Sequence, residues 1–244
     1  MKRGSFIFDG VSSDDVKALI QGRPVIEAPL RKVSWKSPQG VDGDIPIDEG
    51  AYNNTKMDLL MLTDGTDAIV DRQALYNIID TRGRYKEFIP YFDPDKIYRV
   101  MLTESTQFES PYHFRGKQSV GVKFTVKPYK YLVKNDPVTF TATGGQLTNP
   151  TNYTSQPIIR IKGTGPVTLK VNGEDFSIID LPNVITLNSE RYIAYQEDSN
   201  GIPTSMNDKV KMREYPVFKP GVNEVSVTGN VTEIYIQPRW RSLV

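Results

Sequence analysis

Between residues 158 and 236, apolar and polar residues alternate in short stretches, and turn-forming residues separate these stretches. Side chains of a β-strand point to opposite faces in turn, so this alternation is typical of strands with one buried face. No stretch in this region has helical periodicity, and the pattern therefore predicts a β-sandwich. The predicted strands are residues 158–162, 167–171, 174–179, 183–187, 191–196, 223–228 and 231–236.

The stretch RIKGTGPVTLKVNGEDF, residues 160–176, holds glycines and lysines that could indicate a phosphate-binding loop. Such a loop needs Gly-Lys-Ser/Thr followed by a helix, whereas Pro166 is followed here by alternating strand residues. We therefore interpret Gly163 to Pro166 as the connection of a hairpin. Asn172-Gly173 predicts a second hairpin, because a type I′ turn needs positive φ at both central positions.

The first half of the chain combines strands with one helix. Residues 67–84 fit a helix in which Asp67 caps the N-terminus and Leu75, Ile78 and Ile79 share one face. Strands are predicted in the segments 4–10, 56–62, 97–103 and 119–128.

A stretch rich in proline, glycine and charged residues precedes these strands, and we expect an extended hairpin arm at about residues 30–55. Its apolar residues are isolated between polar ones, so the arm has little to bury within its own subunit. A lone two-stranded hairpin is marginal in water, which predicts a contact with another subunit. The candidate interface residues are Val33, Trp35, Pro38, Gly40, Asp42, Gly43, Ile45 and Ile47.

Regular patterning is lost between residues 130 and 137, and the character of the chain changes there. A chain of 244 residues suits one large domain or two ordinary ones. We therefore predict an N-terminal domain over residues 1–130 and a C-terminal domain over residues 131–244.

The charge and the cysteine content of the chain limit the functions and the kinds of site that it can have. Thirty basic and 29 acidic residues leave a net charge of +1, which argues against broad affinity for nucleic acids or membrane surfaces. The absence of cysteine excludes disulfides, thiolate zinc sites and cysteine nucleophiles. No apolar run is long enough for a signal peptide or a membrane span, so we expect a soluble protein that is made in the cytoplasm.

Reacting groups are few. The single histidine, His113, has no second histidine with which to build a metal cluster, and we interpret it as structural. A Ser-His-Asp catalytic triad depends on geometry and not on sequence position, so the sequence does not exclude one. No Gly-x-Ser-x-Gly nucleophile elbow supports such a triad. A calcium site is suggested by four acidic residues, Asp42, Asp44, Asp48 and Glu49. They lack the residue order of an EF-hand loop, so we favour a solvated hairpin tip instead. We therefore expect no catalytic, cofactor or metal site.

Trp240 and thirteen tyrosines raise the possibility of sugar binding, because aromatic rings on a β-sandwich can stack on pyranose rings. The alternative is that Trp240 packs under the sandwich or against the first domain. We favour the alternative, since a buried or half-buried tryptophan is the commoner state.

The order of several segments resembles one family over nearly the whole chain. These segments are FIFDGVSSDDV, SPQGVDGD, IDEGAY, YKEFIPYFDPDKIYRVMLT, VGVKFTVKPY, NPTNYTSQPIIRIKGTGPVTLKVNG and FKPGVNEVSVTGNVTEIYIQPRWRSL. Together they resemble the distal tail proteins, Dit, of long-tailed phages that infect Gram-positive bacteria. The PGRDG usual at the arm tip of this family is replaced here by PQGVDG.

The resemblance implies a mainly β fold. An α+β ring-forming domain with one helix and a belt hairpin would precede a galectin-like β-sandwich, similar to carbohydrate-binding modules. Proteins of this family form a hexameric ring in which the belt embraces the next subunit.

The resemblance also implies a structural role in the virion, at the tail tip, and not an enzyme. The ring joins the tail tube and the tape-measure end to the tail-tip protein and, in some phages, to receptor-binding adhesins. The alternative function is a carbohydrate-binding module that aids adhesion to the host wall. A free-standing module of that kind would not require the N-terminal half.

Overall fold

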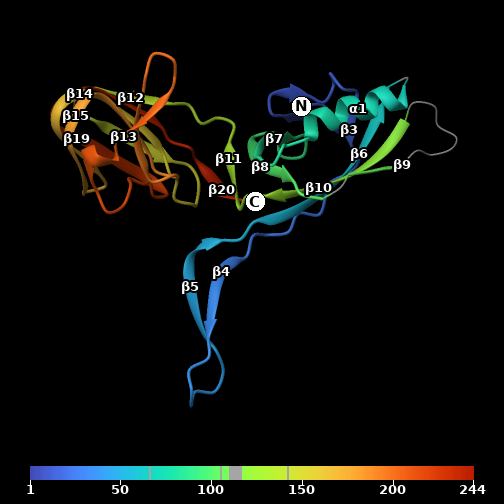
Figure 1. Cartoon of the computed structure of the whole chain (residues 1–244), viewed down its shortest axis with the longest axis horizontal. Helices are drawn as coiled ribbons and strands as arrows, with labels where there is room; N and C mark the ends of the chain where they lie inside the picture. The colour runs from blue at the N-terminus through green and yellow to red at the C-terminus, as the bar shows by residue number, and fades with distance from the viewer. Residues whose placement is uncertain (66, 105, 110–116, 142) are drawn as a thin grey trace. The chain divides into compact units, whose positions relative to one another are not determined.

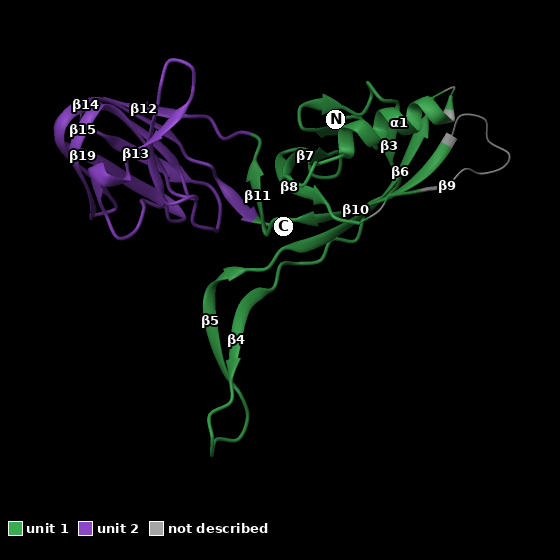
Figure 2. Cartoon of the chain, in the orientation of Figure 1, with its two compact units in different colours: residues 1–133, 243–244 green, residues 134–242 purple. Residues whose placement is uncertain are grey.

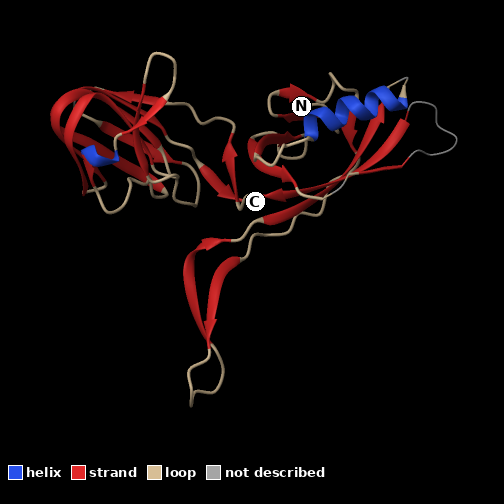
Figure 3. Ribbon diagram, in the orientation of Figure 1, coloured by secondary structure: helices blue, strands red, loops and turns tan. Residues whose placement is uncertain are grey.

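The computed structural model of the chain describes residues 1–65, 67–104, 106–109, 117–141 and 143–244 (Figure 1). The chain forms two compact units (Figure 2). Unit 1 is Met1–Val133 with Leu243–Val244, and unit 2 is Lys134–Ser242. Strands dominate both units (Figure 3), which confirms the mainly β class. The assignment of a function to each predicted domain, 1–130 and 131–244, stays a prediction.

Unit 1 is built around an antiparallel sheet with the strand order β2-β1-β7-β8-β10-β6-β3, to which β9 and β11 add by pairing with β10 and β8. The hairpin β4-β5 forms a sheet of its own. The elements are β1 (Phe6–Phe8), β2 (Val11–Ser12), β3 (Ala18–Ile20), β4 (Arg31–Lys36), β5 (Ile45–Tyr52), β6 (Thr55–Asp64), α1 (Ala68–Ile79), β7 (Lys86–Pro90), β8 (Lys96–Leu102), β9 (Gln107–Glu109), β10 (Lys117–Val126) and β11 (Tyr129–Leu132).

Helix α1 starts where the sequence predicts. The carboxylate of Asp67 accepts hydrogen bonds from the backbone N–H groups of Ile69 and Val70, at 2.9 and 3.2 Å. Leu75 and Ile79 are fully buried, which confirms the predicted apolar face. The helix ends at Ile79, before the end of the predicted segment 67–84, because the backbone of Asp80 is extended. The carboxylate of Asp80 accepts a hydrogen bond from the N–H of Arg82, two residues further on.

The interior of unit 1 lies between α1 and this sheet (Figure 1). Alternate side chains of β10 point into it, as the sequence predicts, and these are Val120, Val122, Phe124 and Val126. Phe8, Phe88 and Phe124 pack against one another there, with ring centroids 5.7–6.0 Å apart. The chain returns to this unit at its end, where the N–H of Val244 donates to the carbonyl of Pro128 at 3.0 Å.

Unit 2 is a curled antiparallel sheet with the order β12-β19-β14-β15-β16-β17, in which β13 also pairs with β19 and β18 with β15. Its elements are β12 (Val138–Phe140), β13 (Gly145–Asn149), β14 (Ile158–Val171), β15 (Glu174–Asn188), β16 (Ile193–Glu197), β17 (Pro203–Ser205), the 3-10 turn η1 (Asn207–Lys209), β18 (Val210–Lys211) and β19 (Gly221–Gln237), and β20 (Arg241–Leu243) follows.

Six of the predicted strands are in fact halves of three long ones. β14 contains 158–162 and 167–171, β15 contains 174–179 and 183–187, and β19 contains 223–228 and 231–236. The predicted hairpin at Gly163 to Pro166 is therefore wrong. The chain bulges there instead, with a register shift between Gly165 and Val167, and continues in the same direction. The turn at Asn172-Gly173 is confirmed, with φ of 52° and 85°.

Each long strand bends at a residue suited to it. A β-carbon on Gly163 would lie 2.1 Å from the carbonyl oxygen of Asn230, so only glycine fits where β14 and β19 approach each other. Gly229 has φ of 119° and Asn183 has φ of 97°, and both stand near the middle of their strands. The halves of β19 on either side of its bend pair with different partners, β13 and β12, and the sheet can thus form both layers of a sandwich.

Candidate functional site: the β4-β5 arm

The predicted arm is present as the hairpin β4-β5, which leaves the sheet of unit 1 (Figure 1). Its register pairs Val33 with Asp48, Trp35 with Pro46 and Lys36 with Ile45. The connection between the strands spans residues 37–44, where Gly40 and Gly43 have φ of 79° and 82°. The extended tip that the sequence predicts therefore has a geometry suited to its glycines.

This register places the apolar side chains of the arm on two faces. Residues that oppose each other in an antiparallel pair point to the same side, and alternate residues along a strand share a face. Val33 and Trp35 therefore lie on one face with Pro46, whereas Ile45 and Ile47 lie on the other. Polar residues share these faces, with Asp48 on the first and Ser34 and Lys36 on the second, so both faces mix apolar and polar side chains.

Both faces are exposed in the single chain. Trp35 is 65% exposed, Ile45 47% and Ile47 40%, and Val33 is half-buried. The tip residues Pro38, Gly40, Asp42 and Gly43 are exposed as well. All eight predicted interface residues are thus on the arm and accessible to a partner, and their contact with one stays a prediction.

At the base of the arm, where it joins the rest of unit 1, three side chains contact one another across the two strands. The guanidinium of Arg31 makes two hydrogen bonds to the carboxylate of Asp48, both of 2.8 Å, and lies 4.8 Å from the centre of the Tyr52 ring. The hydrogen bond from Arg31, with a second from the N–H of Gly50, holds the pKa of Asp48 below its usual value. The same pair raises the pKa of Arg31. These contacts fix the register of the hairpin at its base.

The segments on either side of the arm are tied to one another and to the sheet. The N–H of Asn53 donates to the carbonyl of Leu30 at 2.8 Å, and the hydroxyl of Thr55 donates to the carbonyl of Glu27 at 2.6 Å. Ile26 forms an isolated bridge with Met57 in β6. These contacts hold the base of the arm on unit 1, although the side chains on both faces of the arm are exposed.

The sequence analysis did not include three residues that contribute to the exposed surface or to the base of the arm. Val41 is 54% exposed at the tip, Pro46 stands opposite Trp35, and Arg31 forms the ion pair at the base. Val41 carried the same signal as its neighbours, an apolar residue in a polar stretch. The partners of Pro46 and Arg31 depend on the strand register, which the sequence does not reveal.

The other candidate groups have ordinary surroundings. The hydroxyl of Ser37 donates a hydrogen bond to Asp44, and the hydroxyl of Ser34 donates one to Glu49. These acidic residues of the arm therefore have separate hydrogen-bond partners. No group of three potential metal ligands occurs among the described residues. His113 lies outside the part of the chain that the structure describes.

Trp240 is only 8% exposed and packs on Phe218, with ring centroids 5.8 Å apart, which confirms the favoured interpretation of a buried tryptophan. Within the described ranges, no helix has the length and apolar character needed to cross a membrane.

Comparison with solved structures identifies the fold. The Dit (gp 19.1) protein of phage SPP1 matches with a TM-score of 0.68 and 16% identity, over 98% of this chain and 99% of that one. The chain has the fold of a Dit protein. That structure is described as a paradigm of the hub adsorption apparatus in phages that infect Gram-positive bacteria.

Two structures of the phage P2 baseplate in its activated conformation also match this chain. One matches with a TM-score of 0.57 and 10% identity, over 97% of each chain. The other matches with a TM-score of 0.52 and 8% identity, over 95% of this chain and 97% of that one. No protein-family model and no curated protein matches the sequence. The Dit resemblance inferred from sequence segments is therefore confirmed at the level of fold.

Proposed function

We propose that this protein is a structural component of a phage tail, a hub subunit that forms a ring at the distal end of the tail. The observation that carries the proposal is the match to the SPP1 Dit protein over 98% of this chain, arm and both units included. A protein that shared only one unit with a hub would not match from end to end. The ring joins the tail tube to the tail tip and serves no catalytic purpose.

The arm supplies the contact that holds the ring together. Its apolar residues on two faces lack cover in the single chain, and they become buried when the arm enters the neighbouring subunit. A contact that joins different surfaces of identical subunits closes into a ring when the rotation between subunits fits. Six copies follow from the family resemblance, whereas the arm itself requires only more than one.

The partners follow from this position in the tail. One side of the hexamer faces the major tail protein and the end of the tape measure, and the other faces the tail-tip protein and, where present, receptor-binding adhesins. The protein resides in the virion and is made in the cytoplasm of the host bacterium. The balanced charge suits protein partners rather than the recognition of nucleic acid or a membrane.

Two double variants, one for each face of the arm, test the role of the arm. Val33→Ser with Trp35→Ser alters one face, and Ile45→Ser with Ile47→Ser alters the other. Burial of a large apolar side chain contributes about 1.5–3 kcal/mol, so each double variant should weaken one contact by about 3 kcal/mol or more. Light scattering over a concentration series measures the resulting dissociation of the ring.

The matched control is Lys32→Ser with Lys36→Ser, which changes two exposed residues of the same strand and leaves the apolar side chains in place. Its oligomeric state should equal that of the unaltered protein. A more drastic variant replaces residues 37–44 with a short Gly-Ser turn. The hub proposal fails if the unaltered protein is a monomer at every concentration, and the arm is not the clamp if the shortened variant still forms stable hexamers.

A further inference from the structure

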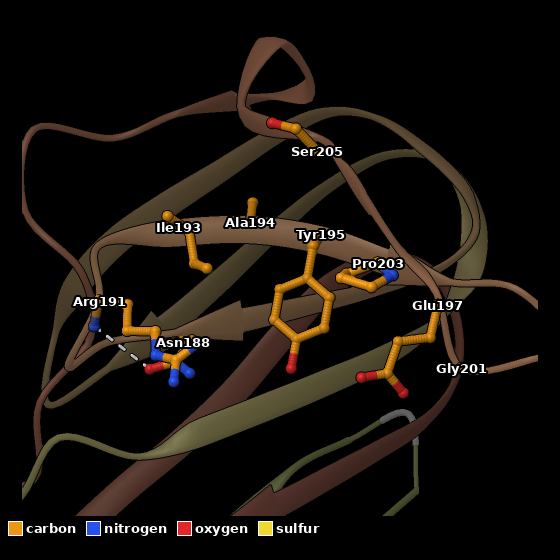
Figure 4. A pocket seen from close by; sticks show the side chains of 9 residues that line it. All are labelled: Asn188, Arg191, Ile193, Ala194, Tyr195, Glu197, Gly201, Pro203 and Ser205. Carbon is orange, nitrogen blue, oxygen red and sulfur yellow. Dashed lines mark hydrogen bonds between the residues drawn. The ribbon is translucent and has the colours of Figure 1, made fainter. Parts of the chain in front are cut away.

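Unit 2 contains a pocket of about 340 Å³ on the outer part of its sheet (Figure 4). This volume lies at the small end of the range for ligand sites, about 300–1,000 Å³. β15 ends at Asn188 on one side of the pocket, the turn that follows carries Arg191, and β16 supplies Tyr195 and Glu197. All of its lining residues belong to unit 2.

The side-chain amide of Asn188 offers a hydrogen-bond donor at the pocket. Asn188 is 7% exposed, and its side-chain oxygen accepts a hydrogen bond from the N–H of Arg191 at 3.3 Å. Its Nδ2 group has no acceptor among the described residues. An amide N–H group that has no protein acceptor is free to donate to a ligand, so this group favours a ligand that accepts a hydrogen bond.

Two opposite charges flank the phenol of Tyr195. Figure 4 shows Arg191 on one side of its ring and Glu197 on the other. Burial, followed by the charge of Glu197, raises the pKa of Tyr195, whereas Arg191 acts in the opposite sense. Neither charge takes part in an ion pair within the described part of the chain. The pocket thus offers a cation, an anion and a neutral hydroxyl in one row.

The walls between these groups are apolar. Ile193 and Pro203 line the pocket together with the ring of Tyr195. Ile193, Tyr195 and Glu197 alternate along β16 and therefore share one face of the sheet. A fitting ligand has hydroxyl groups that both donate and accept, next to C–H surfaces that contact Ile193, Pro203 and the tyrosine ring.

We propose that this pocket binds a neutral saccharide ring, with Glu197 accepting from sugar hydroxyls and with Asn188 and Arg191 donating to them. An inorganic anion fits less well because Glu197 repels it. A free cation fits less well because Arg191 opposes it. The proposal goes beyond the role in the tail hub and is independent of ring formation.

Titration of the full-length protein with individual sugars tests the proposal. The probes are glucose, galactose, mannose, N-acetylglucosamine and N-acetylgalactosamine, and binding is followed by ligand-observed NMR and calorimetry. Inorganic phosphate and glycine are the ionic probes. At least one sugar should bind with a Kd on the order of 1 mM or tighter, a level typical of weak complexes.

Two exposed pocket residues are then altered singly, as Arg191→Ala and Glu197→Ala. Hydrogen bonds to charged groups are the stronger ones, so each variant should weaken sugar binding roughly tenfold or more. The matched controls are Arg213→Ala and Glu214→Ala, which are exposed residues of unit 2 outside the pocket. They should bind as the unaltered protein does.

Each remaining outcome overturns the proposal. These outcomes are no binding of any sugar, binding of phosphate or glycine alone, and sugar binding that survives in both pocket variants. Thermal unfolding of every variant shows whether it is folded. Light scattering reports ring formation separately, so a failure of the sugar site and a failure of the hub proposal are distinguishable.

Discussion

Gly163→Ala should destabilise unit 2 strongly, because the new β-carbon meets backbone that cannot move aside easily. It would lie 2.1 Å from the carbonyl oxygen of Asn230 and 2.9 Å from the Cα of Val231. Ordinary contact begins near 3.4 Å, so β14 and β19 must separate locally by roughly 1.3 Å, the difference between 3.4 and 2.1 Å.

Separation of these strands has two costs. Overpacking with backbone shifts costs about 1–3 kcal/mol, and the weakening of one ladder hydrogen bond adds about 1 kcal/mol. The total is about 2–4 kcal/mol. For a unit of about one hundred residues, each kcal/mol lowers the midpoint of thermal unfolding by roughly 4 °C, so we expect a fall of roughly 8–16 °C.

Differential scanning calorimetry of the full-length protein is the assay, with circular dichroism to show that strand content is retained at low temperature. The control is Gly121→Ala in β10, where the nearest atom to the added carbon lies 4.0 Å away. The control should leave the midpoint unchanged or raise it slightly. If Gly163→Ala unfolds at the same temperature as the unaltered protein, the steric reason for the bend is wrong.

Three further perturbations test the local contacts. Asp67→Ala removes the cap of α1 and should lower the free energy of unfolding by about 1 kcal/mol in urea, and an unchanged value would contradict the cap. Asn223→Ala deletes a fully buried side chain that bonds Lys219, Gly221 and Asn172, and should cost about 2–4 kcal/mol in the same assay. The pKa of Asp48 is lowered in the folded arm, so the stabilisation by its ion pair is present above the ordinary pKa and is lost as the pH falls through the lowered one. NMR titration should show the pKa of Asp48 rising in Arg31→Gln, and no rise would contradict the pairing.

The local features of the fold could be predicted from sequence. The cap at Asp67, the buried face of α1 and the alternation along β10 depend on residues that are near one another in the chain. The turn at Asn172-Gly173 depends on two residues only. Physical rules that act within one or two helical turns or one strand are sufficient for such features.

The bends of the long strands could not be separated from turns by the same rules. The residue types at Gly163 to Pro166, Asn183 and Gly229 occur in turns and in bulges alike. What decides between them is the neighbouring strand, since β14 bulges against β19 over a long common register. That information lies about 70 residues away in the sequence.

The candidate sites show the same division. The apolar residues of the arm were found because they interrupt a polar stretch. Their distribution over two faces and the pairing of Arg31 with Asp48 follow from the register of β4 and β5. The pocket around Asn188 and Tyr195 arises where the end of β15 meets β16, and no residue type in it marks the site by itself.

The path of the chain makes unit 2 an insertion within unit 1. The chain leaves unit 1 after Val133 and re-enters it at Leu243. Val244 then packs against the core of unit 1, and its N–H bonds Pro128, only a few residues before the exit. Insertions whose two ends meet the host at one place are well tolerated. We therefore expect that replacing unit 2 by another domain whose two ends lie close together would leave the fold of unit 1, its arm included, unchanged.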